Sequence, residues 1–251
     1  MIVKIKALLR VWVLAFIYPR PLLGLFYLPR FFMHYLRYKK LPGAEKINFL
    51  DLQPCLGDWT SHTPFDAHYF FQGAWLARKV HKTKVAKHVD VGSSVLTVSV
   101  LSAQVETIFV DYRPLKASLS GLTCMAGNIL DLPFPDNSVP SLSCLHVIEH
   151  IGLGRYGDPI DPNGSVKAAH ELQRVVTRGG HLFLSLPIGR ERICFNAHRV
   201  HAPVSVIKMF ADMHLIEFSY VNDQGEYAEA KHVGDASDFE YGCGLFHFQK
   251  L

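Results

Sequence analysis

The stretch Gly127–His150, GNILDLPFPDNSVPSLSCLHVIEH, decides the fold of this chain. Its segment Asp131–Ser138 contains two prolines and an Asp-Asn-Ser cluster, which cannot continue a strand or a helix. The apolar run Val139–Val147 follows this loop and leads into three ionisable residues, His146, Glu149 and His150. Ionisable groups at the carboxyl end of a buried strand are typical of an open parallel α/β sheet, which binds ligands at that edge.

Two further strands are predicted upstream of this stretch. His88–Ser94, HVDVGSS, indicates a buried strand that breaks into a tight turn before a helix over Val95–Val105. Such a turn presents backbone N–H groups to the polar end of a ligand. Thr107–Asp111 indicates a second strand that ends in an acid about 20 residues beyond the glycine turn, a spacing that suits a ribose diol. NAD-binding folds share this geometry, so it predicts a nucleoside without saying which one.

The remaining elements follow from periodicity and from turn residues. An amphipathic helix is expected from a Thr63 N-cap to about His81, and a second helix ends at Arg178-Gly179-Gly180. This second helix carries the apolar stripe over 166–176. The other expected elements are a strand over 181–187, a short helix over 203–212, strands over 214–221 and 244–249, and a polar loop over 222–238.

These segments resemble the class I S-adenosylmethionine-dependent methyltransferases from about His88 to Pro187. The DLPFPDNS loop and the HVIEH strand end follow in that superfamily's order, and Asp90 and Gly92 match its D-x-G-x-G motif, in which Ser94 replaces the second glycine. From Thr63 onward the segments HYFFQ, GRYGDPIDP and FNAHR also resemble an uncharacterised family of methyltransferase-like proteins, a domain of unknown function. The resemblance implies a Rossmann-like, mostly parallel seven-stranded α/β sheet with helices on both faces.

The resemblance also implies S-adenosylmethionine as the cofactor and a set of residues around it. Asn128 stands where the superfamily usually has an acid that reads the adenine amine, and Ile129 is expected beside the ring. The expected cofactor-binding residues are Asp90, Gly92, Ser93, Ser94, Asp111, Asn128, Ile129 and His146.

The acceptor side is expected at the ends of the fourth and fifth strands. There a side chain can orient or deprotonate the group that receives the methyl. The candidate catalytic residues are His146, Glu149 and His198. The loop 152–164 and the segment after the fifth strand supply the expected substrate contacts Arg155, Tyr156, Asp158 and Arg199.

The sequence HVIEH also matches the H-x-x-E-H pattern, in which two histidines four residues apart on a helix bind zinc. The preceding run is rich in valine, serine and cysteine and favours a strand, and no third ligand follows at helical spacing. We therefore expect no metal. Histidines at these positions also serve as ordinary strand-end hydrogen-bonding groups.

The composition separates residues 1–40 from the rest of the 251-residue chain. This arm has eight cations and no acid, so its charge of +8 leaves −4 for the remainder of a chain whose net charge is +4. Its longest uncharged runs are far shorter than the roughly 20 residues that span a bilayer. Its aromatic side chains suit either the surface of an anionic membrane or a helix packed on the domain. We expect an arm over 1–40, a connector over 41–62 and a domain over 63–251.

The folded part is mildly acidic, which argues against a nucleic-acid partner. Five cysteines without a C-x-x-C pair favour a reducing compartment, so a cytoplasmic protein is expected, with the arm at the inner face of the membrane. The predicted function is methyl transfer to an unidentified acceptor, a small molecule or a membrane-linked glycan. The alternatives are an inactive methyltransferase-like scaffold and a nicotinamide-dependent oxidoreductase, for which a full G-x-G-x-x-G is missing.

Overall fold

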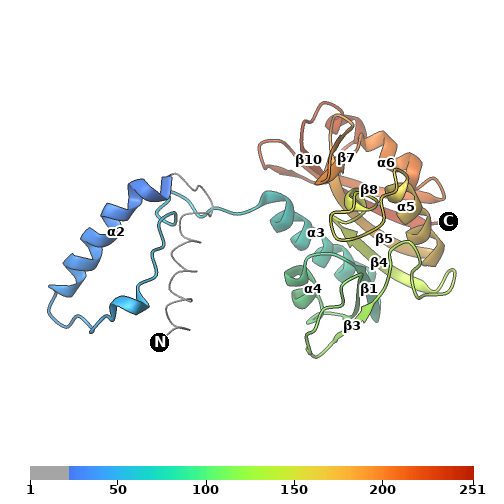
Figure 1. Ribbon diagram of the computed structural model, residues 1–251. Helices are drawn as coiled ribbons and strands as arrows, with labels where there is room; N and C mark the ends of the chain where they lie inside the picture. The colour runs from blue at the N-terminus through green and yellow to red at the C-terminus, as the bar shows by residue number, and fades with distance from the viewer. Residues whose placement is uncertain (1–22) are drawn as a thin grey trace. The chain divides into compact units, whose positions relative to one another are not determined.

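The computed structural model describes residues 23–251, in two compact units of which the first ends at Phe65 and the second spans Asp66–Leu251 (Figure 1). The part of the predicted arm over residues 1–22 lies outside the described residues. Among residues 23–251, no helix has both the length and the apolar character needed to cross a bilayer.

The first unit contains one long helix, α2 (Leu23–Lys39), and a short 3-10 turn over Phe49–Asp51. The Arg30 guanidinium lies over the ring of Trp59 at 4.4 Å from its centroid, and its Nη2 donates a hydrogen bond to the Leu56 carbonyl at 3.5 Å. These contacts hold the segment that follows the turn against the helix. Arg37 and Lys39 lie in the last turn of α2, where cations favour the helix dipole.

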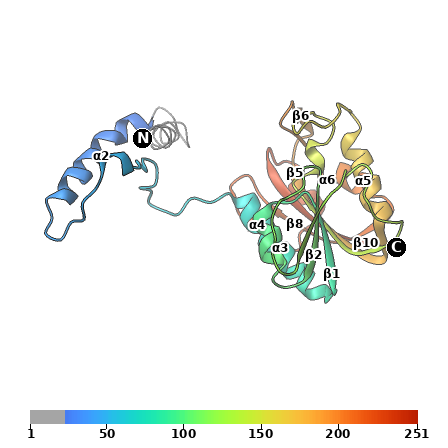
Figure 2. The same ribbon diagram turned by 60° about the horizontal axis from the view of Figure 1, so that its bottom comes forward.

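The second unit is built on an eight-stranded sheet with the order β3-β2-β1-β4-β5-β10-β8-β9 (Figures 1 and 2). The neighbours from β3 to β5 pair in parallel, whereas β10 is antiparallel to both β5 and β8. The strands are β1 (Lys87–Val91), β2 (Glu106–Asp111), β3 (Leu122–Ala126), β4 (Val139–Leu145), β5 (Val176–Ile188), β8 (Met213–Val221), β9 (Tyr227–Ala228) and β10 (Gly242–Lys250).

The predicted α/β fold is confirmed, with one strand more than the seven expected. The extra strand is β9, two residues long, inside the segment predicted as a loop. The Asn222 side-chain oxygen accepts hydrogen bonds from the backbone N–H groups of Gln224 at 3.0 Å and Glu226 at 2.9 Å. This tight turn brings Tyr227 back into pairing with Val221 at the sheet edge. A separate hairpin joins β6 (Arg192–Cys194) to β7 (His198–Val200).

Helices cover both faces of the sheet (Figure 2). On one face α3 (Ala67–Thr83) buries Trp75, Leu76 and Val80 against Phe183 and Leu245. Its N-cap is Asp66, which accepts from the Tyr69 N–H at 3.2 Å, and not Thr63 as predicted. The shorter helix α4 (Val95–Leu101) lies on the same face, and the opposite face is covered by α5 (Gly164–Val175) and α6 (Pro203–Met209).

A buried chain of hydrogen bonds joins β1 to β4 in the middle of the sheet. The His88 ring bonds the Ser141 hydroxyl through Nδ1 at 2.7 Å and the Ser143 hydroxyl through Nε2 at 2.8 Å. Ser143 in turn donates to the Asp90 carboxylate. Burial lowers the pKa of His88 to about 3 and raises the pKa of Asp90 to about 6. His88 is therefore a neutral imidazole that links two serine hydroxyls.

The buried imidazole predicts a specific dependence of stability on pH. The pKa of His88 is below that of the unfolded state, so the unfolded chain binds one more proton between about pH 6.5 and 3. His88→Gln removes this term. As the pH falls through that window, the free energy of unfolding of the wild type should drop relative to the variant by about 1.4 kcal/mol per pH unit. Urea denaturation at a series of pH values measures this difference.

A matched control is His170→Gln, because His170 is exposed on α5. Its stability curve should run parallel to that of the wild type. Parallel curves for His88→Gln as well would contradict a neutral buried His88.

Candidate active site

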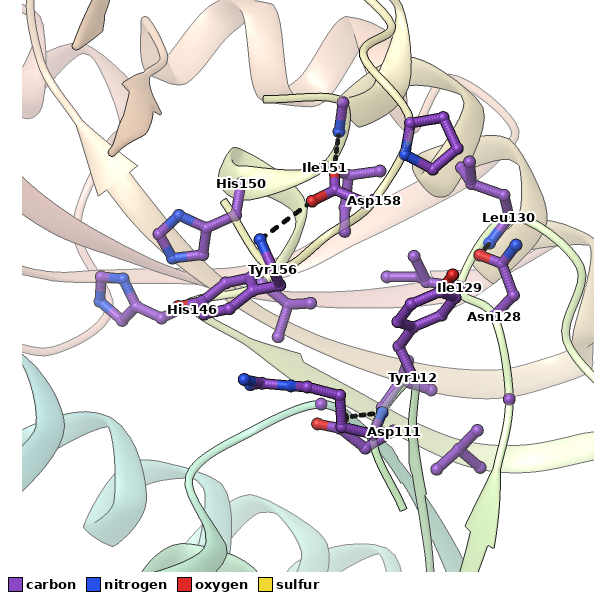
Figure 3. Close-up of a pocket in the computed structure, with 18 residues that line it drawn as sticks. Asp111, Tyr112, Asn128, Ile129, Leu130, His146, His150, Ile151, Tyr156 and Asp158 are labelled. Atoms are coloured by element: carbon purple, nitrogen blue, oxygen red, sulfur yellow. Dashed lines mark hydrogen bonds between the residues drawn. The ribbon is translucent and has the colours of Figure 1, made fainter. Parts of the chain in front are cut away.

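The first pocket of the second unit lies at the carboxyl ends of β1 to β4, and we call it the strand-end pocket (Figure 3). Four consecutive strands of a parallel sheet supply its walls, at the edge where such sheets bind ligands. Most of its lining is apolar, with a few polar groups between. The residues that line the strand-end pocket include Gly92, Asp111, Asn128, Ile129, His146, Val147 and Tyr156.

Gly92 forms the turn that closes the pocket at the end of β1. Its φ is +70°, and a Cβ built on it would stand 3.2 Å from the Val147 Cγ1 and 3.9 Å from the Asp111 Oδ2. A side chain here would both strain the backbone and fill the pocket. The missing second glycine does not obstruct this turn, because Ser94 lies outside the lining and is the N-cap residue of α4.

The polar residues next to Gly92 stabilise the turn through buried hydrogen bonds. Asp90 is fully buried, and its Oδ1 accepts from the Ser93 N–H at 3.1 Å. The Ser93 hydroxyl accepts from the Leu145 N–H at 3.0 Å. Three predicted cofactor ligands are absent from the lining of the strand-end pocket: Asp90, Ser93 and Ser94. The side chains of Asp90 and Ser93 instead make hydrogen bonds that link β1 to β4.

Asp111, Asn128 and Ile129, three of the predicted cofactor-binding residues, lie on the pocket wall (Figure 3). One Asp111 oxygen, Oδ1, accepts from the Arg113 N–H at 2.7 Å, which fixes the carboxylate at the strand end and leaves Oδ2 on the Gly92 side. The Asn128 Oδ1 accepts from the Leu130 N–H at 3.0 Å. The side-chain carbonyl of Asn128 thus stabilises the turn after β3, and the N–H groups of its side-chain amide can donate to a ligand.

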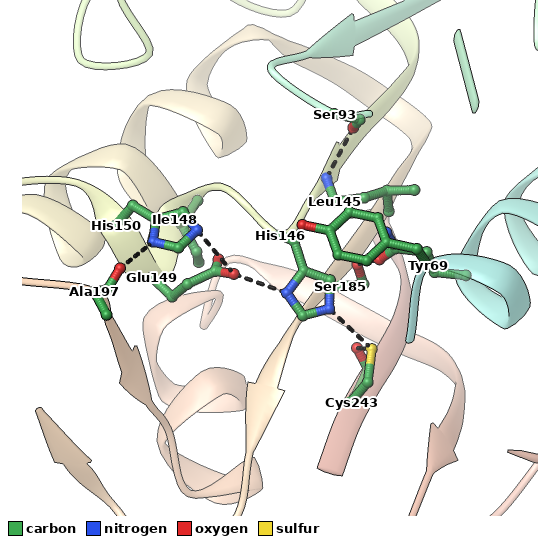
Figure 4. A network of polar contacts seen from close by, with 12 residues as sticks. Tyr69, Ser93, Leu145, His146, Ile148, Glu149, His150, Ser185, Ala197 and Cys243 are labelled. Atoms are coloured by element: carbon green, nitrogen blue, oxygen red, sulfur yellow. Dashed lines mark hydrogen bonds and ion pairs between the residues drawn. The ribbon is translucent and has the colours of Figure 1, made fainter. Parts of the chain in front are cut away.

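His146 stands at the end of β4 in a strained conformation, with φ of +54° (Figure 4). Its Nδ1 bonds the Glu149 Oε1 at 2.9 Å, and its Nε2 lies 3.5 Å from the Cys243 Sγ. Its ring stacks on His68 and on Tyr69, with centroids 5.5 and 5.4 Å apart. Strain of this kind persists where the surroundings over-determine a conformation, as at functional sites.

The electrostatics around Glu149 set the charges of the nearby histidines. Burial alone would lower the pKa of His146, but the Cys243 sulfur and the Glu149 carboxylate raise it to about 10. Burial alone would raise the pKa of Glu149, but His146 lowers it. The two form a buried, oppositely charged pair. Burial lowers the pKa of His150 and of His198, so both are neutral at pH 7.

A second pocket, which we call the polar pocket, opens on the other side of His146. The Glu149 Oε2 has no hydrogen-bond partner among residues 23–251, although it is buried. Arg155 donates to the Ala197 carbonyl at 3.0 Å, and its guanidinium lies 5.1 Å from the Tyr156 ring centroid. The lining includes His68, Tyr69, His146, Glu149, His150, Arg155, Tyr156, His198 and Tyr241. The three predicted catalytic residues thus line one cavity.

Two predicted substrate residues have other positions. Arg199 is absent from the lining of both pockets, since its guanidinium donates to the Ile151 carbonyl at 2.7 Å and to the Ser165 hydroxyl at 3.1 Å. The Asp158 carboxylate accepts from the backbone N–H of Gly152 at 2.7 Å and shapes the loop, on the side of the strand-end pocket.

Sequence reasoning missed Tyr241 and Cys243. Tyr241 directly precedes β10 and Cys243 lies at its start, far from His146 in the sequence. The antiparallel pairing of Cys243 with Pro187 brings Tyr241 into the lining of the polar pocket and the Cys243 Sγ to 3.5 Å from the His146 Nε2. A run of alternating residues reveals a strand but not its neighbours. The H-x-x-E-H pattern does not form a helical zinc site, because Ile148–His150 is a single 3-10 turn and the His150 Nδ1 bonds the Ala197 carbonyl at 2.6 Å.

The geometry at Gly92 predicts a matched pair of stability effects. Gly92→Ala and Gly179→Ala each place an alanine at a φ near +70°, which costs about 1–2 kcal/mol. Nothing lies within 4 Å of a Cβ at Gly179, whereas Val147 crowds a Cβ at Gly92. Urea denaturation should therefore show the larger loss for Gly92→Ala. Equal losses would mean that Val147 does not close over the turn.

Two family models match parts of the second unit. Residues 82–184 match the family model described as methyltransferase domain, and residues 137–240 match that of a Caenorhabditis protein of unknown function. No curated protein matches the chain.

Two solved structures illustrate the likeness in fold. The N-methyltransferase NodS from Bradyrhizobium japonicum is 15% identical with a TM-score of 0.52, and the match covers 74% of this chain and 97% of that one. The 1,6-didemethyltoxoflavin-N1-methyltransferase from Burkholderia thailandensis, solved with 1,6-didemethyltoxoflavin and S-adenosylhomocysteine bound, is 12% identical with a TM-score of 0.50, over 73% of this chain and 78% of that one.

The strand-end pocket fits the cofactor of this family, S-adenosylmethionine. The space above Gly92 is one that a Cβ would fill, and the Asp111 carboxylate lies beside it at the end of β2, where a ribose diol is expected. Residues 82–184 therefore match the methyltransferase family model, and residues 66–251 have a methyltransferase-like fold with a pocket that fits S-adenosylmethionine.

Proposed function

We propose that this protein catalyses methyl transfer from S-adenosylmethionine to a small-molecule or glycan acceptor. The observation that carries the proposal is that the strand-end pocket and the polar pocket meet at His146, which lines both. A methyl transfer needs donor and acceptor held in line in adjoining sites, and positioning supplies most of the catalysis. When bound, S-adenosylmethionine supplies an electrophilic methyl group on a positively charged sulfur.

On the donor side, four residues have distinct roles in this proposal. Asp111 accepts hydrogen bonds from the ribose hydroxyls through its Oδ2. Asn128 bonds the adenine edge, and Ile129 packs against the ring. Gly92 allows the backbone to approach the ligand closely. The support is their common position on the wall of one mostly apolar pocket.

On the acceptor side, the protonation states of the histidines favour His198 as the base. His198 is neutral at pH 7 because burial lowers its pKa, and it lines the polar pocket. A neutral imidazole can take a proton from an acceptor hydroxyl or amine. His146 is protonated through its contact with Glu149 and serves better to orient the acceptor or donor. Glu149 keeps one buried oxygen free to receive an acceptor hydrogen bond.

The remaining polar contacts would select the acceptor. Arg155 and Tyr156 line the polar pocket at its rim, and Tyr156 also lines the strand-end pocket. The Arg113 guanidinium lies 4.6 Å from the Tyr156 ring centroid on the strand-end side. Two arginines and an aromatic ring favour a polar acceptor that carries hydroxyl or anionic groups.

The cofactor assignment is tested by calorimetric titration of the full chain with S-adenosylmethionine and S-adenosylhomocysteine. Asp111→Ala should weaken binding of both by about 10- to 100-fold, the equivalent of a hydrogen bond to a charged group. Glu106→Ala is the matched control, an exposed acid at the opposite end of the same strand, and should bind like the wild type.

The outcomes separate the alternatives. Absence of binding by a folded wild-type chain would favour the inactive scaffold, whose support is the serine at position 94. Binding of NAD alone would favour an oxidoreductase. Binding that Asp111→Ala leaves intact would place the nucleoside elsewhere.

The proposal extends to an acceptor presented at a membrane surface, such as a lipid-linked glycan, in the cytoplasm. All five cysteines are free, which suits a reducing compartment. The described part of the arm supports membrane contact: α2 has no acid in its first turn, and cations in its last. Its exposed apolar side chains include Phe26, Met33 and Leu36. Basic and apolar groups together favour an anionic lipid interface.

Vesicle sedimentation tests this extension. The full chain should sediment with vesicles that contain phosphatidylserine but not with pure phosphatidylcholine vesicles. Arg37→Glu/Lys39→Glu should weaken this binding at least roughly tenfold, at about 1 kcal/mol per cation. The charge-matched control is Lys82→Glu/Lys87→Glu in the second unit, where both lysines are exposed. Equal loss in the two variants would argue for a net-charge effect and against contact through α2.

A further inference from the structure

Three side chains with metal-ligating atoms converge around His146, the residue that lines both pockets. His68 lies in the first turn of α3, His146 at the end of β4 and Cys243 at the start of β10. One ligand atom from each lies within 4.8 Å of the other two. Residues from three elements distant in sequence thus bring two imidazoles and a thiol to one point.

The His146 ring has the orientation of a metal ligand. Its Nδ1 faces the Glu149 carboxylate at 2.9 Å, which leaves Nε2 directed at the Cys243 Sγ (Figure 4). Metal-bound histidines characteristically donate their other ring N–H to a carboxylate, which fixes the ring and the tautomer. Glu149 is fully buried and is held at this position by the 3-10 turn that follows β4.

The distances fit a tetrahedral ion. With Zn–N of about 2.0–2.1 Å and Zn–S of about 2.3 Å, the nitrogen and sulfur of a tetrahedral site lie about 3.5 Å apart. The separation of the His146 Nε2 and the Cys243 Sγ is 3.5 Å. Bringing the His68 ring to a similar separation takes a shift of roughly 1 Å, in a side chain at the open rim of the polar pocket.

We propose that His68, His146 and Cys243 bind a Zn²⁺ ion. A thiolate with two imidazoles is a donor set that selects zinc over magnesium or calcium. To ligate the ion, His146 gives up its Nε2 proton and Cys243 its thiol proton. The charges then balance, since the dication, the Cys243 thiolate and the Glu149 carboxylate sum to zero. This set differs from the H-x-x-E-H pattern and departs from the sequence-based expectation of no metal.

The proposed site leaves one coordination position open toward the polar pocket. His68 and His146 line that pocket, and three protein ligands with an open fourth position are typical of catalytic zinc. The open position would hold a water or an oxygen, nitrogen or sulfur atom of the acceptor, and would lower its pKa. This role rests on the proposed function, whereas metal binding itself does not.

The experiment uses the full chain, freed of metal by chelation and titrated with Co²⁺ as a spectroscopic substitute for Zn²⁺. One equivalent should produce thiolate-to-cobalt charge-transfer absorption, which Zn²⁺ should then displace. Cys243→Ser should abolish this absorption. Glu149→Gln should weaken Co²⁺ binding by about 10- to 100-fold, as is usual when the partner of a ligating histidine is lost.

Two controls keep the test decisive. Cys124→Ser changes a partly buried cysteine on β3 away from the site and should leave the absorption unchanged. His68→Ala alters a partly exposed side chain and should weaken Co²⁺ binding with little effect on unfolding in the metal-free chain. No charge-transfer absorption in the folded wild type, or an unchanged absorption in Cys243→Ser, would overturn the proposal. Titration of the metal-free chain with S-adenosylhomocysteine reports the cofactor site separately.

Discussion

The structure depends on one buried set of hydrogen bonds between β1 and β4. His88, Ser143 and Asp90 link the two strands side chain to side chain, and the Ser93 hydroxyl carries the connection on to the backbone of Leu145. Buried polar groups are costly unless every one finds a partner, and a satisfied network fixes a single arrangement. Because this network ends at the residue before His146, it sets the glycine turn and the end of β4 relative to each other.

That constraint explains why His146 can be shared by two pockets. A strand end held this firmly can support a residue at φ of +54°, and the ring is then turned to face Glu149 on one side and Cys243 on the other. The strand-end pocket is mostly apolar and suits a nucleoside, whereas the polar pocket gathers histidines, an arginine and a buried carboxylate. The strained His146, together with His150 and Tyr156, thus lies between the donor side and the acceptor side.

The sequence predicted the parts of the site that depend on local pattern. Gly92 and Asp111 follow strands whose apolar runs are plain, so their common edge of the sheet could be inferred from the parallel order. Asp90 and Ser93 were assigned to the ligand because a motif records spacing and not the direction in which a side chain points. Arg199 lies outside both pockets for a similar reason: a charged residue after a strand can face the crevice or bond the backbone of a neighbouring loop.

The contribution of β10 could not be predicted from the sequence. Strand order in a mixed sheet arises from long-range pairing, and the antiparallel insertion of β10 between β5 and β8 places Cys243 beside Pro187 and near His146. The helix cap was a smaller error of the same kind, since Thr63 and Asp66 both suit an N-cap and only the geometry of the Tyr69 amide decides.

The interior position of β10 has a consequence for synthesis of the chain. Until Gly242–Lys250 has left the ribosome, β5 and β8 have no strand between them, and each lacks its pairing with β10. The nascent chain therefore exposes two apolar sheet edges that invite pairing with other chains. The last strand closes both edges in one step, and the wall of the polar pocket at Tyr241 is completed in the same step.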